Sequence, residues 1–294
     1  MICMDKAAKA NVVNLSLQYK NEKTYTYLKT SQIDHPVGLQ LFGFSAQNTV
    51  KAVQIIQNCA VYDILDLNFG CPVPKVTRTG AGSAWLKEPE LLEQYAAAVV
   101  QASSKPVTAK IRLGWDSKSI NVFEVTHRLE RARVSAVAIH CRTKEQGYAG
   151  KADYSAIKGL RETVGIPLAV SGDIFTLDDA IKSVNETNAD FVMVARGGVG
   201  NPKLITQINT YFETGEKLPD ATPVEQLQYA REFSKQLIGM RGEAVGVREL
   251  RGLLPPFFRG FPGYKKIRNS LAMYMTTLED LENIFHGVEK ILGL

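Results

Sequence analysis

The chain has 294 residues, of which 45% are hydrophobic and 22% charged, so it can form one large barrel, with or without a small extra domain. No apolar run reaches the roughly 18 residues that a membrane span needs, and the N-terminal MICMDKAAKAN has the pattern of neither a signal peptide nor a basic transit sequence. We therefore expect a cytoplasmic protein without a membrane partner. The net charge of +5 permits a nucleic-acid partner without requiring one.

The expected elements alternate along the chain between strand-length apolar runs and longer amphipathic stretches. This alternation favours a parallel sheet with helical crossovers. A doubly wound sheet usually has a glycine-rich fingerprint after its first strand, and none is present here. The expected strands are residues 12–17, 37–42, 63–68, 107–112, 136–140, 167–171 and 191–195, and the expected helices are 46–60, 89–102, 120–131, 154–164 and 176–188.

Seven strands are one fewer than a (β/α)8 barrel contains. We therefore predict an α/β fold, a (β/α)8 TIM barrel over residues 1–219 that lacks its first strand in the sequence as given. Residues 220–294 show helical patterns and no clear strand, which predicts a separate, small all-α domain. Within it, Leu253-Leu254-Pro255-Pro256 is expected to end a helix, because proline cannot donate to the preceding turn.

The C-terminal domain is rich in basic residues. Charge patterning alone leaves a solvated surface and a nucleic-acid contact equally open. These basic residues are Arg241, Arg248, Arg251, Arg259, Lys265, Lys266 and Arg268.

The four cysteines are Cys3, Cys59, Cys71 and Cys141, and they show no CxxC or CxxH spacing. They indicate a reducing compartment with free thiols, and no disulfide or metal site. Cys59 and Cys141 lie in apolar segments, where packing is the expected role. Cys71 differs, because Gly70 and Pro72 end the regular structure after a strand and hold the thiol on a tight loop.

Polar side chains follow most of the expected strands, where barrel enzymes carry their chemistry. Each cationic pair at spacing i, i+2 points to one face of its strand. Taken singly, a histidine at a strand end is more often a structural hydrogen-bond partner. Several cations at one rim nevertheless require an anion, which predicts a phosphate, a flavin, a nucleotide or RNA. The rim residues are Gln40, Lys110, Arg112, His140, Arg142, the Ser171-Gly172-Asp173 turn and the Ala195-Arg196-Gly197-Gly198 turn.

Five short motifs follow one another along the chain. They are NFGCP at 68–72 followed by Lys75-Val76 and GAGS at 80–83, KIRLGW at 110–115, HCRTKEQGYAGKADY at 140–154, SGDI at 171–174 and ARGGVGNP at 195–202. The chain resembles the tRNA-dihydrouridine synthases in these motifs, to about residue 215 and more weakly through the helical domain.

The resemblance implies a flavoenzyme in which NADPH (or NADH) reduces FMN. Reduced FMN then passes a hydride to C6 of a uridine in tRNA, and Cys71 protonates C5 from the opposite face. A free thiol has a pKa of about 8.5, so it is mostly protonated at pH 7 and can act as a general acid. The target base must be flipped out of its stack to reach a pocket at the rim. A monomer is the expected state.

The family's functional residues map onto this chain as follows. Gln40 and Lys110 contact the flavin ring, His140 lies beside it, and Arg142 lies near the flavin or the substrate. Gly172, Asp173, Ala195 and Arg196 hold the ribityl phosphate, and Ser171 also belongs to the cofactor site. The residues expected to contact tRNA are Asn68, Lys75, Arg78, Arg251, Arg259, Lys265, Lys266 and Arg268.

Three departures from the family pattern keep alternatives open. The family's first strand is absent, about 25 residues or one βα unit, Ser171 replaces an asparagine, and Asn14 stands where many members have an acidic residue. A start at an internal methionine and a truncated paralogue both account for the first departure, and we favour the internal start. The two rival functions are a non-catalytic tRNA-binding paralogue and another FMN barrel oxidoreductase acting on a small pyrimidine.

Overall fold

The computed structural model describes residues 28, 30 and 35–294, which form two compact units. The first unit comprises the described residues up to Ile174 together with Asp178–Val194, and the second comprises Phe175–Leu177 and Ala195–Leu294. The second unit thus begins before the boundary that we expected at residue 219. The expected strand at residues 12–17, Asn14 and the expected absence of a first strand lie outside the described residues.

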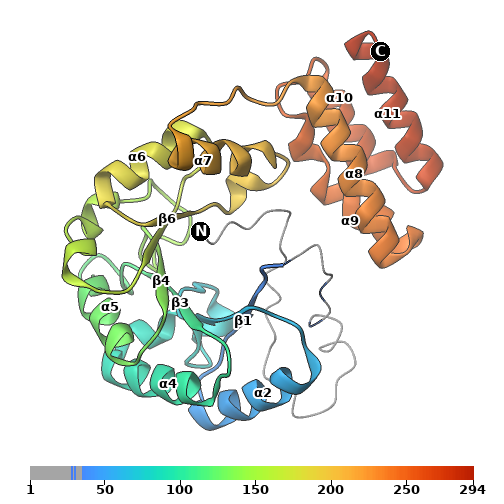
Figure 1. The fold of residues 1–294 in the computed structure, drawn as a ribbon. Helices are drawn as coiled ribbons and strands as arrows, with labels where there is room; N and C mark the ends of the chain where they lie inside the picture. The colour runs from blue at the N-terminus through green and yellow to red at the C-terminus, as the bar shows by residue number, and fades with distance from the viewer. Residues whose placement is uncertain (1–27, 29, 31–34) are drawn as a thin grey trace. The chain divides into compact units, whose positions relative to one another are not determined.

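The first unit is built on one parallel sheet whose strands follow each other in chain order (Figure 1). Parallel neighbours in this order need a right-handed crossover connection between them, as in a (β/α) barrel. The barrel prediction is therefore confirmed. The strands are β1 (Gly38–Leu41), β2 (Ile64–Asn68), β3 (Val107–Arg112), β4 (Ala136–His140), β5 (Leu168–Ser171) and β6 (Phe191–Met193).

Helices cover the outer face of this sheet (Figure 1). Their apolar stripes are buried; Leu92, Ala96 and Val99, for example, are inaccessible to solvent. Ser45 caps the first of these helices by accepting a hydrogen bond from the N–H of Asn48. The helices are α2 (Ala46–Cys59), α4 (Pro89–Ala102), α5 (Val122–Arg131) and α6 (Leu177–Thr187).

The helix expected at residues 154–164 is wrong. The segment forms two 3₁₀ turns instead, η4 (Tyr154–Ile157) and η5 (Arg161–Thr163). Gly159, between them, has a φ of +79°, a left-handed conformation that a continuous α-helix cannot contain.

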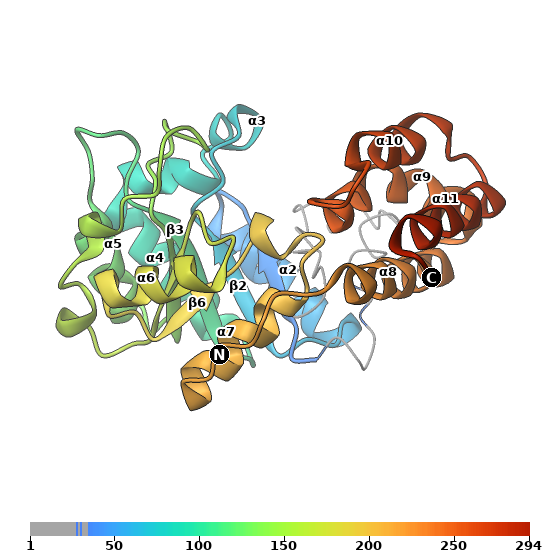
Figure 2. The same ribbon diagram turned by 90° about the horizontal axis from the view of Figure 1, so that it is seen from above.

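The loops that follow β2, β3 and β4 rise on one side of the sheet (Figure 2). Among them lie the single turn α3 (Pro74–Thr77) and the 3₁₀ helix η3 (Gly82–Lys87). Because the strands are parallel, this side carries all of their carboxyl ends.

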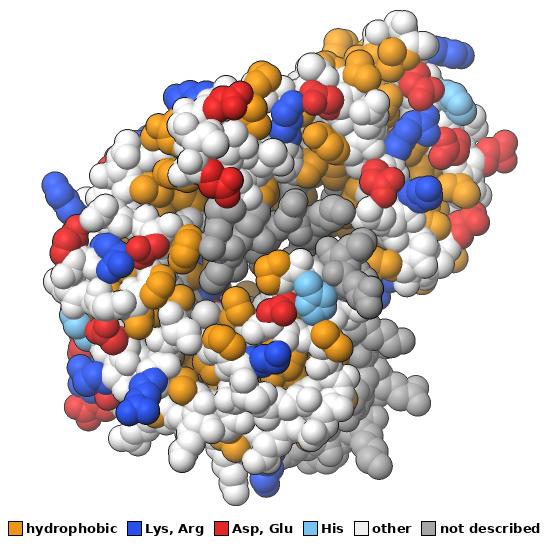
Figure 3. Space-filling model, in the orientation of Figure 1, with side chains coloured by type: hydrophobic (Ala, Val, Ile, Leu, Met, Phe, Trp, Pro, Cys, Tyr) orange, Lys and Arg blue, Asp and Glu red, His pale blue; other side chains and the backbone are white. Residues whose placement is uncertain are grey.

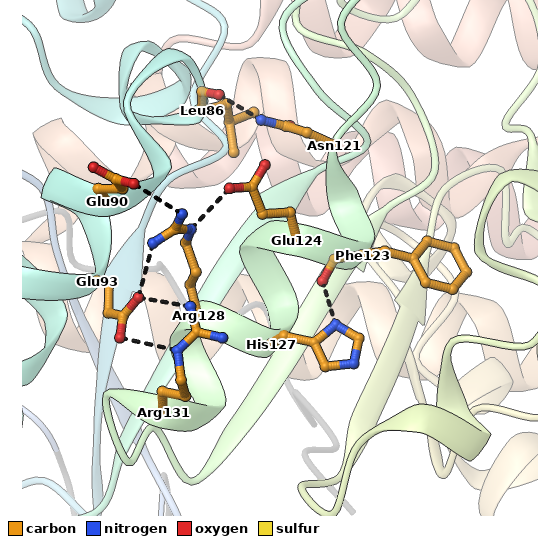
Figure 4. A network of polar contacts seen from close by, with 9 residues as sticks. All are labelled: Leu86, Glu90, Glu93, Asn121, Phe123, Glu124, His127, Arg128 and Arg131. Carbon is orange, nitrogen blue, oxygen red and sulfur yellow. Dashed lines mark hydrogen bonds and ion pairs between the residues drawn. The ribbon is translucent and has the colours of Figure 1, made fainter.

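Helices α4 and α5 are tied together by ion pairs (Figure 4). Arg128 donates to Glu90, Glu93 and Glu124, and Arg131 donates to both oxygens of Glu93. These groups are mostly exposed, so each pair adds little stability by itself. The network links two neighbouring helices on the outer face of the sheet.

The described residues of the second unit form helices, turns and loops but no strand, as expected, and the unit has its own core. Leu250, Leu254, Phe258, Leu271 and Met275 are inaccessible to solvent. The Leu-Leu-Pro-Pro stretch ends one helix as predicted, and a 3₁₀ turn, η7 (Pro255–Phe258), follows. The helices are α7 (Lys203–Thr214), α8 (Pro223–Arg241), α9 (Glu243–Leu253), α10 (Tyr264–Asn269) and α11 (Leu278–Leu292), with the π-helical turn η8 (Ser270–Tyr274) after α10.

None of the helices in the described part of the chain combines the length and the apolar character that crossing a bilayer requires.

Candidate active site at the carboxyl ends of the strands

Polar side chains occupy the inner face of the sheet in three layers set by the strand register. Alternate residues of a strand point to the same face, so the pairing partners of one strand continue the layer on the next. The lowest layer contains Gln40, Asp66 and Thr108, the middle one Asn68, Lys110 and Ala138, and the one nearest the rim Arg112, His140 and Ser171.

The Cys71 loop (residues 69–73) is held through its backbone. The side-chain oxygen of Asn68 accepts hydrogen bonds from the N–H groups of Gly70 and Cys71, at 3.1 and 2.8 Å. The carbonyl oxygen of Cys71 accepts from the N–H of Ser83 at 3.1 Å. The thiol is half-buried. The loop therefore fixes the position of Cys71 while leaving its sulfur accessible.

Gly82 allows the loop to lie against η3. A Cβ atom at Gly82 would lie 2.8 Å from the carbonyl oxygen of Cys71, and the φ of +61° is one that glycine adopts most easily. The GAGS motif is thus explained by close backbone packing behind the cysteine.

Arg112 clamps the Cys71 loop to the loop after β4. The guanidinium is buried, with 2% of the residue exposed. Its Nε donates to the carbonyl oxygen of Gly70 at 2.7 Å, and its Nη1 donates to those of Thr143 and Gly147 at 2.9 Å each. From the sequence, Arg112 was predicted only as a cation at the rim. Its spacing from Lys110 does not indicate that it binds three carbonyl oxygens.

His140 is neutral at pH 7. Burial, together with the positive charges of Lys110, Arg112 and Arg142, lowers the pKa of His140 to about 3. Its Nε2 lies 3.3 Å from Nη1 of Arg142, which can only donate, so we assign the ring proton to Nδ1. The ring therefore offers Nδ1–H as a donor.

Arg142 joins this histidine to the SGDI turn. Its Nη2 donates to a carboxylate oxygen of Asp173 at 2.6 Å, and the N–H of Ala152 donates to the same oxygen at 2.8 Å. At Gly172, where φ is +122°, a Cβ would lie 2.9 Å from the Cβ of Ala152 and 3.1 Å from the His140 ring. The turn thus packs tightly enough to require glycine.

Within the described part of the chain, Sγ of Cys71, Nζ of Lys110 and Nδ1 of His140 make no hydrogen bond. Burial and the charge of Arg112 lower the pKa of Lys110 to about 8, and the carboxylate of Asp66 opposes part of this shift. An ammonium in the barrel interior without an ion-pair partner fits a ligand that brings its own acceptor atoms. In the described residues, no group of three or more His, Cys, Asp or Glu side chains is placed to hold a metal ion.

The depressed pKa gives a prediction for the ligand-free protein. We expect Lys110→Met to be more stable than the wild type at pH 7, because the folded wild type holds its ammonium in a desolvated site. The folded pKa, about 8, lies below the value of about 10.4 in an unfolded chain, so the unfolded state binds more protons between these pH values. Wild-type stability therefore rises with pH through this window, and the advantage of the variant shrinks.

Melting temperatures of both proteins from pH 7 to 10 check this prediction. Lys182→Met, which removes an exposed lysine of α6, is the control and should track the wild type. If the difference in melting temperature between Lys110→Met and the wild type stayed constant from pH 7 to 10, the prediction would be wrong.

A family model described as "Dihydrouridine synthase (Dus)" matches residues 8–291. The chain belongs to the dihydrouridine synthase family. A probable tRNA-dihydrouridine synthase 1 of Synechocystis sp. is 38% identical over 243 residues, covering 81% of this chain and 66% of that protein. A tRNA-dihydrouridine synthase B of Vibrio vulnificus is 34% identical over 255 residues, covering 85% of this chain and 78% of that protein. The chain thus spans just under two thirds of the first relative's length.

A solved structure of histamine dehydrogenase from Rhizobium sp. 4-9 superposes with a TM-score of 0.44 and 14% identity, over 58% of this chain and 27% of that one.

The remaining expected site residues are not members of these three layers. Lys75 and Arg78 are exposed on and directly after α3. Ala195 and Arg196 belong to the second unit, where the guanidinium of Arg196 lies 5.6 Å from the ring centre of Phe175. Their roles at the phosphate, like the roles assigned to the other site residues, stay predictions.

The basic residues expected to contact tRNA in the second unit are mostly exposed. Arg259, Lys265, Lys266 and Arg268 are all exposed, whereas Nε of Arg251 donates to the carbonyl oxygen of Ala272 at 3.0 Å. On the face shown in Figure 3, basic and acidic side chains are interspersed. Arg251 therefore has a structural contact that charge patterning did not indicate.

One cysteine prediction is confirmed and one is wrong. Cys141 is fully buried, as expected for a packing residue, but Cys59 is exposed. Cys59 is the last residue of α2, where the helix end faces solvent rather than the sheet.

Proposed function

We propose that this chain is an FMN-dependent tRNA-dihydrouridine synthase that reduces uridines in tRNA to 5,6-dihydrouridine, with NADPH (or NADH) as the electron donor. The observation that carries the proposal is the Cys71 thiol on a backbone-held loop at the rim, where Nζ of Lys110 and Nδ1 of His140 have no hydrogen-bond partner among the described residues. Family membership supplies the reaction class.

The residues present fit a flavin. The ammonium of Lys110, which has no ion-pair partner in the part of the chain that the structure describes, suits the electron-rich edge of an isoalloxazine ring, and the neutral His140 offers a donor beside it. Arg142 keeps that histidine in one tautomer, and the hydroxyl of Ser171 lies in the same layer as His140. Gly172, Asp173, Ala195 and Arg196 are the proposed phosphate group contacts. Bound FMN would supply the hydride for C6 of the uracil ring.

Cys71 supplies the proton. Saturating the C5–C6 bond needs one hydride and one proton, and the protonated thiol delivers the proton to C5 from the face opposite the flavin. Asn68 keeps the backbone of Cys71 fixed, so the sulfur approaches the flipped base in one direction.

The tRNA contacts we propose are exposed cations. Lys75 and Arg78 beside the Cys71 loop can bind phosphates near the flipped nucleotide, and Arg259, Lys265, Lys266 and Arg268 can bind the backbone elsewhere. A helical unit carrying exposed cations suits a large polyanion better than a small pyrimidine substrate.

The test is a combined spectrum and activity assay on the 294-residue chain. The purified protein should absorb in the flavin bands, release FMN on denaturation, and form dihydrouridine in tRNA that lacks it when NADPH is present. Reactions without NADPH are the control. A colourless, well-folded protein that binds tRNA without modifying it would replace the proposal with the non-catalytic paralogue.

A further inference from the structure

A chain of side-chain hydrogen bonds runs across β3, β2 and β1 and ends at the backbone of Cys71. Oγ1 of Thr108 donates to Oδ1 of Asp66 at 2.6 Å, and Nε2 of Gln40 donates to Oδ2 of Asp66, also at 2.6 Å. Nδ2 of Asn68 donates to Oε1 of Gln40 at 2.7 Å. Oδ1 of Asn68 then accepts from the N–H of Cys71 at 2.8 Å.

The two ends of this chain dictate its direction. An ionised Asp66 can only accept, so Gln40 must turn its NH₂ group toward it and its oxygen toward Asn68. Asn68 must then donate to Gln40, which leaves its oxygen for the Cys71 loop. The loop directs the N–H groups of Gly70 and Cys71 toward Asn68, so a flipped Asn68 would place donor against donor.

We propose that Asp66 is a positioning residue for Cys71 and acts through Gln40 and Asn68. Asp66 does not touch the loop itself; its carboxylate selects one orientation for two amides in series, and the second amide holds Cys71. That the thiol so positioned is a proton donor rests on the proposed function, whereas the positioning does not.

The setting of Asp66 supports this role. It pairs in register with Gln40 on one side and Thr108 on the other, so both bonds lie between neighbouring strands rather than in a mobile loop. Burial raises the pKa of Asp66, and the bonds from Gln40 and Thr108 and the charge of Lys110 oppose that rise. The hydrogen bond from Gln40, through which Asp66 would orient the Cys71 loop, thus also favours the ionised carboxylate.

Two variants separate the acceptor from the charge. Asp66→Leu removes the acceptor at similar size, whereas Asp66→Asn keeps an acceptor for Gln40 and removes only the charge, since the hydroxyl of Thr108 can turn to accept from the new amide. The readout is the alkylation rate of Cys71 by iodoacetamide in the protein freed of flavin, followed by peptide mass spectrometry.

We expect alkylation of Cys71 to rise about fivefold in Asp66→Leu, which corresponds to about 1 kcal/mol, and to stay within twofold of the wild type in Asp66→Asn. The half-buried sulfur becomes more accessible when the loop loosens. Thr108→Val is the matched control, because it removes a bond to the same carboxylate that does not lead to Cys71; it should stay within twofold.

Other cysteines report the state of the fold in the same spectra. Cys59 is exposed and gives the intrinsic reagent rate, and Cys141 is buried and becomes reactive only on unfolding. If Cys141 reacts in Asp66→Leu, that variant has unfolded and Gln40→Met replaces it, because it removes the next hydrogen bond of the chain. Gln40→Met should show the same fivefold rise in the alkylation rate of Cys71 while Cys141 stays unreactive. The proposal would be overturned if the alkylation rate of Cys71 rose equally in Asp66→Leu and Asp66→Asn. It would also be overturned if that rate rose in neither Asp66→Leu nor Gln40→Met.

Dihydrouridine formation, measured in parallel, keeps the two proposals apart. In Asp66→Leu we expect it to fall about tenfold, with Asp66→Asn restoring it to near the wild-type rate. A wild-type protein that makes no dihydrouridine refutes the proposed function and leaves the alkylation result to decide the positioning role by itself.

Discussion

The Cys71→Ala variant is expected to keep its bound flavin and to lose dihydrouridine formation by a factor of about 10²–10⁴, the range that a positioned general acid contributes. The thiol makes no hydrogen bond in the described part of the chain, so alanine removes the proton without disturbing the loop. Asn68 still holds the backbone N–H groups of residues 70 and 71. The measurement is single-turnover formation of dihydrouridine in tRNA by the protein reduced beforehand with NADPH.

Cys59→Ala provides the control, because this exposed thiol lies at the end of α2. It should retain the wild-type rate. Reduction of the flavin by NADPH should be unchanged in Cys71→Ala, since the thiol acts only on the uridine. A Cys71→Ala protein that modifies tRNA at the wild-type rate would show that another group or water supplies the proton.

Replacing Arg112 with methionine is expected to destabilise the first unit by about 3 kcal/mol. Methionine keeps the apolar stem but leaves the carbonyl oxygens of Gly70, Thr143 and Gly147 without their charged donor. Burying a cation without a carboxylate is itself costly, and its removal offsets part of the loss. For a unit of this size the melting temperature should fall by about 8 °C.

Tryptophan fluorescence measures this change selectively. The two tryptophans of the chain, Trp85 and Trp115, both belong to the first unit, and Trp85 packs edge-on against Phe69 of the Cys71 loop. Arg131→Met is the matched control, because that guanidinium is largely exposed, and its melting curve should stay close to that of the wild type. An Arg112→Met protein that melts with the wild type would mean that the buried charge costs as much as its three bonds contribute.

Local pattern was enough to locate most elements of the first unit. Residues 136–140 coincide with β4, because a buried parallel strand is nearly continuous in apolar residues, and residues 107–112 coincide with β3, in which apolar residues alternate with polar ones. The segment 154–164 was predicted as a helix from its amphipathic spacing, but Gly159 adopts a left-handed conformation that interrupts it. Cys59 was misassigned because an apolar segment does not tell which residue of a helix end faces solvent.

The candidate site was only partly predictable. The rim position of Cys71, Lys110 and His140 follows from their places at strand ends, because the carboxyl ends of parallel strands share one side of the sheet. The partners of Asp66 and Arg112 did not follow: Arg112 contacts the Cys71 loop directly, and Asp66 is connected to it through Gln40 and Asn68.

The sequence by itself determined the βα alternation, the tight Gly-Cys-Pro loop and the family motifs, since each depends on neighbours within a few positions. Only the tertiary structure decided that Arg112 binds carbonyl oxygens 31, 35 and 42 positions away and that Asp66 reaches Cys71 through Gln40. Such contacts depend on the register between strands and on loop closure, and a shift of one residue would turn every one of these side chains to the other face.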